Sequence, residues 1–426
     1  MIVPLIQLFH SFLLLILEFV SYPEFYVYPY LVSLKLLPYS QIIDHHFPGL
    51  FMLPVNFYTL NFQDPASFKS LLVILVIFQS ALIAKITKKL FSSKLVSCVS
   101  VLAFALWQPI FQGNQLWVDT ILPLFILLAF NANLNSKWFQ SGLFLGLGLI
   151  FKQSLLPLVA LAFILHPSKK FLIGAAVPLL AILSYFWYLG VLSDFLYWTI
   201  PYNLLTYAQL SAKLPITTDL LKLALPALII LVSLRHAKLR ILIIWLVFSI
   251  FGGLSRFELV HLQPGVPFLA ILTGALFVNK KSITGLTLAT LMFLEFIGYI
   301  RHQNNFFKYR FFDTTTLSVA KKIIQYSDSN KSVFLFGVQP HLYALTHTRP
   351  VGSFFVFPLP WLLTNLQNRQ LQAIQLDPPK LIVYDTASVV DGQPLSVTAP
   401  ILLEYILRYY KPIDRDGSVI FYENRY

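Results

Sequence analysis

Acidic side chains are rare in this sequence, and three of them stand where apolar runs begin or end. Glu24 and Asp44 lie about twenty positions apart in a segment rich in tyrosine and proline, and Asp119 opens a later apolar run. A carboxylate in such a place can take the proton of an attacking hydroxyl group. We therefore treat these three acids as candidate catalytic residues.

Cationic and hydrogen-bond-donating side chains at other ends of apolar runs could hold an anion. The candidates for this role are His45, His46, Lys152, Gln153, Arg256 and His261. Donors and cations of this kind stabilise the negative charge that grows on a leaving group such as a phosphate. Together with the three acids they provide the residue types for a transfer reaction that releases a phosphate.

The composition indicates an integral membrane protein. Of 426 residues, 57% are hydrophobic and only 12% are charged, which is too few charges to solvate a globule of this size. The 31 Lys and Arg residues exceed the 18 Asp and Glu residues, but they form short clusters between apolar runs. Such clusters are typical of cytoplasmic loops that face anionic lipid, so we expect membrane lipids and no nucleic acid as partners. Cys98 is the only cysteine, which excludes an intrachain disulfide and a multi-thiolate metal site.

Apolar runs recur along residues 1–300 and predict a polytopic α-helical membrane domain with about eleven transmembrane helices. The runs are residues 3–21, 70–86, 95–112, 119–134, 138–151, 153–165, 170–192, 219–234, 239–254, 264–279 and 282–300. The first run has no basic leader and no small-residue cleavage pattern, so we expect a retained helix. We interpret 138–165 as two short spans with Lys152 and Gln153 at their tip, because one long helix would break the alternation of basic loops.

The basic residues mark every second loop between these runs. They are Lys85, Lys88, Lys89, Lys94, Lys137, Lys169, Lys170, Arg235, Lys238, Arg240, Lys280 and Lys281. The positive-inside rule then places the amino terminus in the cytoplasm, and the first loop, 22–68, and the carboxyl-terminal region outside the cell membrane. In this topology all the candidate residues lie at the external side.

Residues 301–426 have their own pattern and predict an extracytoplasmic α/β domain. Thr314–Tyr326 is amphipathic, with Asp313 placed to cap it, and predicts a helix. The strands that we expect are Ser332–Phe336, Leu381–Tyr384 and Val419–Tyr422, with helices near 359–374 and 399–410 between them. Strands that alternate with helices favour a largely parallel sheet.

Five short segments also carry a resemblance to a known family. They are Pro23-Glu24-Phe25-Tyr26, Asp44-His45-His46-Phe47-Pro48, Asp119 at the start of the fourth span, Lys152-Gln153 after a glycine-rich span, and Arg256–Pro267 before a late span. In this order they resemble the GT-C glycosyltransferases, typified by protein O-mannosyltransferases and aminoarabinose transferases. The first segment has one acid where the family often has an Asp-Glu pair, so the base remains open between Glu24 and Asp44.

The resemblance implies an inverting glycosyltransferase that takes a sugar from a polyprenyl-phosphate donor. Its acceptor would be a hydroxyl group of a lipid, glycan or protein at the external face of the cell envelope. Asp119 would orient the acceptor or the base, and Lys152, with Arg256 or a histidine, would hold the donor phosphate. We expect no required cofactor; a divalent metal is compatible with His45 and His46 but is not indicated.

Other interpretations stay open for the same residues. Glu24 and Asp44 could be solvated loop carboxylates, and Asp119 could be only a helix N-cap. Lys152 could extend to the membrane interface. In two further alternatives, Arg256 forms a structural ion pair with Glu258, and His261 is an interfacial histidine.

The whole chain could also have another function. A transporter or flippase of lipid-linked sugars would need similar helices and charges without catalysis. We favour the enzyme, because we see no internal repeat and because the polar candidates lie at span ends rather than in mid-membrane. A lipid-linked sugar polymerase or ligase would be expected to carry its large external segment between late spans, whereas here that segment is carboxyl-terminal.

Overall fold

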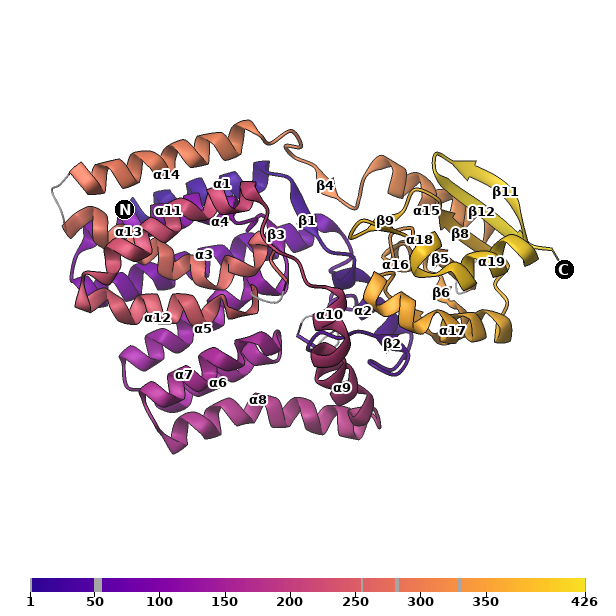
Figure 1. The fold of residues 1–426 in the computed structure, drawn as a ribbon, viewed down its shortest axis with the longest axis horizontal. Helices are drawn as coiled ribbons and strands as arrows, with labels where there is room; N and C mark the ends of the chain where they lie inside the picture. Colours follow the sequence, from indigo (N-terminus) through magenta and orange to yellow (C-terminus); the bar gives the residue numbers. More distant parts are fainter. Residues whose placement is uncertain (1, 50–55, 254–255, 280–282, 328–330, 426) are drawn as a thin grey trace. The chain divides into compact units, whose positions relative to one another are not determined.

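The computed structural model describes residues 2–49, 56–253, 256–279, 283–327 and 331–425 (Figure 1). By its internal contacts the chain forms two compact units. Unit 1 consists of Met1–Ser21, Pro65–Leu183 and Ala212–Arg310, and unit 2 consists of Tyr22–Asp64, Ser184–Ser211 and Phe311–Tyr426. The first loop and the carboxyl-terminal region therefore fold into the same unit. Lys280 and Lys281, predicted to lie in a cytoplasmic loop, fall outside the described residues.

Unit 1 is built from long apolar helices. They are α1 (Ile2–Ile16), α3 (Pro65–Phe91), α4 (Lys94–Ile110), α5 (Val118–Leu134), α6 (Trp138–Leu149), α7 (Leu156–Leu165), α8 (Lys169–Tyr188, which ends in unit 2), α11 (Thr217–Leu234), α12 (Arg240–Ser249), α13 (Val266–Asn279) and α14 (Ile283–Arg301). Each predicted apolar run overlaps one of these helices. By length and composition, four described helical segments could cross a membrane: Pro65–Phe91, Lys169–Tyr188, Thr217–Leu234 and Leu259–Phe277. The number of about eleven spans stays a prediction.

The first helix is shorter than predicted. α1 ends at Ile16, and Phe19–Ser21 forms the strand β1 instead of a last helical turn. This strand pairs in parallel with β3 (Gln115–Leu116) on one side and with β4 (Tyr309–Arg310) on the other. Residues 19–21 pair with distant strands instead of continuing the helix. An apolar sequence alone does not reveal such pairing. The small sheet fixes the chain just before α5 begins.

The segment 138–165 forms two helices, as predicted. α6 ends at Leu149, a short 3-10 helix, η1 (Gln153–Leu155), follows, and α7 then begins with Pro157 in its first turn. Proline is favoured in a first helical turn, where its missing N–H costs nothing, so Pro157 suits a new helix that begins here. Lys152 lies in this break in an extended conformation, with φ −154° and ψ 117°.

Small residues bring the helices of unit 1 close together. A Cβ atom at Gly142 would lie 2.0 Å from the carbonyl oxygen of Phe171, and one at Gly146 would lie 2.5 Å from that of Ala175. These glycines let α6 approach the backbone of α8. Gly274 does the same for α13 against Ser100 of α4.

Unit 2 contains a five-stranded sheet. Its order is β11 (Tyr410–Asp416), β12 (Val419–Asn424), β8 (Leu381–Asp385), β5 (Ser332–Phe336) and β6 (Arg349–Pro350). The three predicted strands are thus confirmed. The prediction of a largely parallel sheet is wrong, because β12 pairs antiparallel with both β8 and β11. A tight turn with Gly417 at φ +60° joins β11 to β12, and such a turn allows only antiparallel pairing.

Five described helices belong to this α/β region. They are α15 (Thr314–Tyr326), α16 (Leu342–Thr346), α17 (Pro360–Leu376), α18 (Leu395–Thr398) and α19 (Pro400–Tyr409). Three of them, α15, α17 and α19, are the ones that the sequence predicts. The carboxylate of Asp313 accepts the backbone N–H of Thr316 at 2.8 Å, which confirms the predicted cap. Two apolar clusters that include strand residues form the core of this α/β region.

Candidate active site

Asp119, Lys152 and His261 come together in unit 1. Lys152 Nζ donates to both carboxylate oxygens of Asp119, at 2.8 and 2.7 Å. His261 Nδ1 lies 2.8 Å from Asp119 Oδ2 and 3.1 Å from Lys152 Nζ. The three residues are far apart in the sequence, so their contact is a product of the fold. One carboxylate is shared here by an ammonium group and an imidazole.

Three different elements position these side chains. Asp119 lies in the first turn of α5, where negative charge is favoured by the helix dipole, but it is not the N-cap, which is Trp117. Lys152 comes from the break before α7. His261 belongs to a 3-10 helix, η5 (Leu259–Gly265), which leads into α13.

Nδ1 of His261 is the ring nitrogen that faces the other two members of the cluster. The Asp119 carboxylate can only accept a hydrogen bond from it, whereas the Lys152 ammonium group can only donate one to it. The contacts of His261 within the cluster thus involve Nδ1 and not Nε2. The His261 side chain is 13% exposed. The cluster therefore offers a fixed imidazole edge and an ammonium group to a ligand.

Arg256 is engaged elsewhere in unit 1. Its Nη2 and Nε donate to Glu258 Oε1 at 2.9 and 3.1 Å, and Lys213 Nζ lies 3.5 Å from the same oxygen. The structural ion pair considered from the sequence is therefore present. Gln153, the neighbour of Lys152, opens η1 and is half-buried.

The other predicted candidates lie in unit 2, in the first loop. Asp44 Oδ1 accepts the backbone N–H of His46 at 2.7 Å and lies 2.8 Å from His46 Nδ1. His45 Nδ1 is 3.6 Å from the same oxygen. One ligand-type atom from each residue lies within 4.8 Å of the others. Imidazole and carboxylate are ligands that divalent transition metals accept, so the chemistry of the trio fits such an ion.

The two first-loop carboxylates are buried, at 7% exposure for Glu24 and 2% for Asp44, and they are not solvated loop acids. Burial raises the pKa of Glu24 to about 8, with the nearby charge of Asp44 contributing, and no described residue donates a hydrogen bond to Glu24 Oε2. For Asp44, desolvation is outweighed by the neighbouring histidines and their hydrogen bonds, which lower its pKa to about 2. The fold thus separates the two acids into a protonated and an ionised carboxyl group.

The α/β region holds the first loop in place within unit 2. Glu24 begins a helix of this loop, α2 (Glu24–Ser33), and Tyr30 on it donates to the carbonyl of Thr348 at 2.9 Å. The loop strand β2 (Ile42–Ile43) pairs in parallel with β7 (Phe355–Val356). The position of Asp44, directly after β2, therefore depends on residues more than 300 positions away.

A second segment of unit 2 supports His45. Asn203 Nδ2 donates to the His45 carbonyl at 2.7 Å, and the ring of Tyr207 lies 4.3 Å from the imidazole ring. Trp361 of α17 approaches the same imidazole edge-on at 6.1 Å. Sequence reasoning missed these three residues. An asparagine and two aromatic residues in an aromatic-rich sequence give no signal that could have identified them.

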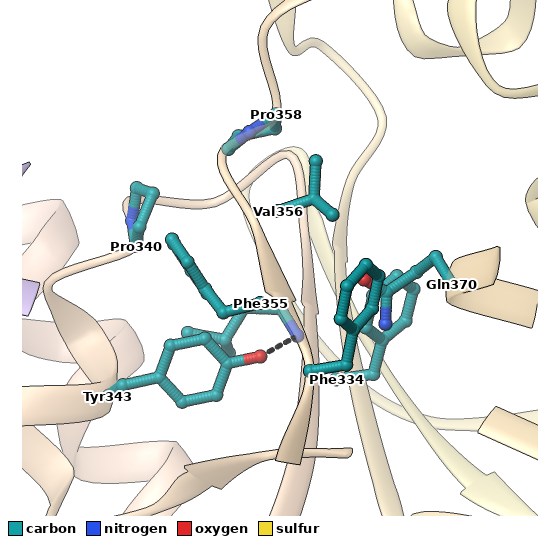
Figure 2. Close-up of a pocket in the computed structure, with 9 residues that line it drawn as sticks. Phe334, Pro340, Tyr343, Phe355, Val356, Pro358 and Gln370 are labelled. Atoms are coloured by element: carbon teal, nitrogen blue, oxygen red, sulfur yellow. Dashed lines mark hydrogen bonds between the residues drawn. The ribbon is translucent and has the colours of Figure 1, made fainter. Parts of the chain in front are cut away.

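A small pocket in unit 2 contains none of the predicted site residues (Figure 2). Aromatic and apolar side chains of β5, α16 and β7 line it, together with Gln370 of α17. The hydroxyl of Tyr343 accepts the Leu335 N–H at 3.2 Å and donates to the Val333 carbonyl at 3.0 Å. Both of its hydrogen bonds are thus made to the backbone. The nine lining residues include no carboxylate and no cation, so this pocket lacks the groups needed for the predicted chemistry.

The fold, an apolar helical unit with an α/β region, is similar to that of solved structures of ArnT. Among solved structures, ArnT from Cupriavidus metallidurans bound to undecaprenyl phosphate is similar, with a TM-score of 0.62 and 13% sequence identity over 99% of this chain and 97% of that chain. The apo state of ArnT gives a TM-score of 0.60 and 12% identity, over 99% and 96%. No protein-family model and no curated protein matches the sequence. The resemblance to GT-C enzymes is thus confirmed as a likeness of fold along the whole chain.

Proposed function

We propose that the chain is an inverting glycosyltransferase that moves a sugar from a polyprenyl-phosphate donor to a hydroxyl group. The observation that carries this proposal is the full-length fold likeness to ArnT, whose structure was solved with undecaprenyl phosphate. The acceptor is a hydroxyl of a lipid, glycan or protein. The external location of the reaction, with the amino terminus in the cytoplasm, rests on the alternation of basic loops.

In this proposal the cluster in unit 1 binds the donor phosphate. Lys152 supplies a positive charge, and the imidazole of His261 supplies a hydrogen-bonding group beside it. Asp119 neutralises Lys152 and orients His261 while no anion is bound. When the sugar–oxygen bond breaks, the phosphate gains charge, and cations that are already oriented stabilise it at little further cost.

The base in this proposal is Glu24. A general base works best when its pKa is near the working pH, and the pKa of Glu24 is about 8, whereas that of Asp44 is about 2. An ionised Glu24 would be a strong proton acceptor in its buried surroundings. Asp44 is held by His46 and serves to orient the loop.

No metal is required by this scheme. The Asp44–His45–His46 trio could hold a divalent ion, and chelation would test that separately from catalysis. If such an ion is bound, Asp44 and the two imidazoles are its ligands, and Glu24 keeps its role in proton transfer.

Gene deletion combined with complementation tests the proposal. Mass spectrometry should find a glycan or glycolipid that is lost on deletion and restored by the wild-type gene but not by Glu24→Gln. A matched control is Glu404→Gln, because Glu404 is an exposed carboxylate of α19. If Glu24→Gln restored the product fully, the base would move to Asp44, and if Asp44→Asn and Asp119→Asn restored it as well, a transporter or flippase of lipid-linked sugars would become the better interpretation. If deletion removed no glycoconjugate, the proposed function would be wrong.

A further inference from the structure

Beyond the charged cluster, unit 1 contains a buried amide network next to His261. Gln263 lies two positions after His261 on η5 and is 1% exposed. Its Nε2 donates to the backbone carbonyls of Gln108 at 2.8 Å and of Phe111 at 2.7 Å. Both hydrogens of the side-chain amide are therefore used to tie η5 to the end of α4.

Of the two carbonyls that Gln263 binds, that of Phe111 lies just beyond the end of α4, whereas the Gln108 carbonyl also accepts the backbone N–H of Gly113 at 2.8 Å. The last carbonyls of any helix lack an intrahelical partner, and α4 ends at Ile110. In an apolar helical unit an unsatisfied carbonyl is costly, so the amide of Gln263 has a strong reason to stay in this one orientation. The bonds thus fix the backbone of η5, and His261 with it.

The same network reaches toward Asp119. The side chain of Gln108, also 1% exposed, donates to the Gly113 carbonyl and lies 3.1 Å from His10 Nε2. A Cβ atom at Gly113 would lie 2.5 Å from the backbone oxygen of Gln108, so the turn favours glycine. This turn leads through β3 to the first turn of α5, which carries Asp119. One set of amide bonds therefore holds the two segments that present His261 and Asp119 to each other.

We propose that Gln263 is a positioning residue, which sets the orientation of His261 toward Asp119 and so the affinity of the cluster for a lipid-linked phosphate. This inference rests on the proposed function. Gln263 touches neither Asp119 nor Lys152 in any described hydrogen bond, so it acts through the backbone of η5. A merely structural amide would change stability but would not act through His261.

A double-mutant cycle with undecaprenyl phosphate as the probe tests the inference. The full-length protein in nanodiscs carries Gln263→Leu, His261→Ala or both, and the dissociation constant for undecaprenyl phosphate is measured together with thermal stability. We expect Gln263→Leu to weaken binding roughly tenfold in the wild-type background, and to have almost no effect on binding in the His261→Ala background. Such coupling would show that Gln263 acts through His261.

Thr273→Val is the matched control. Thr273 is 5% exposed, lies farther along on α13, and donates to the Leu269 carbonyl at 2.8 Å, so its loss removes a buried hydrogen bond away from the cluster. It should lower stability and leave the affinity unchanged. If Gln263→Leu does not fold, Gln263→Asn replaces it, because the shorter amide cannot reach both carbonyls, and the same coupling is expected.

The outcomes separate the inference from the proposed function. Wild-type affinity in Gln263→Leu, or an equal loss of affinity in both backgrounds, would overturn the positioning role while the proposed function stands. A wild-type protein that does not bind undecaprenyl phosphate would contradict the proposed function itself, and the positioning role would fall with it.

Discussion

The two groups of candidate residues differ in how their charges are compensated. In unit 1, Asp119 is matched by Lys152 and His261 within 2.8 Å, so each charge has a partner of opposite sign or a hydrogen bond. In unit 2, Asp44 has His46, whereas the carboxylate of Glu24 is buried and its Oε2 has no donor among the described residues. The first arrangement suits the binding of an anion, and the second suits the transfer of a proton.

The comparison shows how burial acts differently on similar side chains. A buried carboxylate with cationic partners remains ionised, and a buried carboxylate without them becomes protonated. A proton acceptor must be able to hold the proton that it takes. On this ground Glu24 is the better base, although the sequence alone leaves Glu24 and Asp44 as alternatives.

The largest expected effect comes from Glu24→Gln. We expect transfer to fall by about 10²- to 10⁴-fold, the usual contribution of a general base, because the amide keeps the shape and cannot accept the proton. Binding of undecaprenyl phosphate should be unchanged. Initial rates and binding measured on the same preparation would check both statements, and a fully active Glu24→Gln enzyme would move the base to Asp44, with Asp44→Asn as the next variant.

A smaller loss is expected for Lys152→Ala. Charge-assisted hydrogen bonds contribute about 1.5–3 kcal/mol, so the rate at limiting donor should fall by roughly ten- to a hundredfold. Lys88→Ala is the control, because Lys88 is an exposed lysine of α3. Unchanged kinetics at limiting donor would mean that Lys152 serves only to neutralise Asp119.

The pH dependence of stability should distinguish the two first-loop acids. The folded pKa of Glu24, about 8, lies above its ordinary value of 4.5, so its stabilising contribution is complete below pH 4.5 and is lost as the pH rises through 8. The folded pKa of Asp44, about 2, lies below its ordinary value, so its contribution is constant in this range. The melting temperature should fall between pH 6 and 9 in wild type and in Asp44→Asn, and should fall less in Glu24→Gln.

The smallest loss of stability is expected at the hydrogen bond between the first loop and the α/β region. Tyr30→Phe removes the hydrogen bond to the Thr348 carbonyl and should cost about 1 kcal/mol of stability. Hydrogen exchange of α2 should become faster, while the transfer rate should stay near that of wild type. Tyr188→Phe, at a tyrosine that is 82% exposed, should change neither. Unaltered exchange in α2 after Tyr30→Phe would show that this bond does not hold the loop.

The fold could be predicted from the sequence where the pattern is local. The apolar runs predicted the helices. The Asp313 cap and the strand at Ser332–Phe336 could be predicted from neighbouring residues. The mixed sheet and the strand at Phe19–Ser21 could not be predicted, because each depends on pairing with residues distant in the sequence. The pairing of Ile42–Ile43 with Phe355–Val356 is the same kind of case.

The candidate site was predictable only as a list of residue types. The scarcity of charges identified Asp119, Lys152 and His261, but the sequence did not show that one carboxylate binds both of the others. For Arg256 the sequence left two alternatives, binding of the donor phosphate and an ion pair with Glu258, and the structure contains the ion pair. Gln263 was not identified at all, because a single glutamine before a proline has no periodicity or motif that marks it.

Infrared titration of the carboxyl groups tests the central claim most directly, namely that the fold holds Glu24 protonated and Asp44 ionised. For the protein in nanodiscs, the absorption of protonated carboxyl groups at pH 7 should include a component that disappears as the pH rises through about 8, is missing in Glu24→Gln and persists in Asp44→Asn. A band that persists in Glu24→Gln and is lost in Asp44→Asn, or a Glu24 that ionises near its ordinary value of 4.5, would contradict the account.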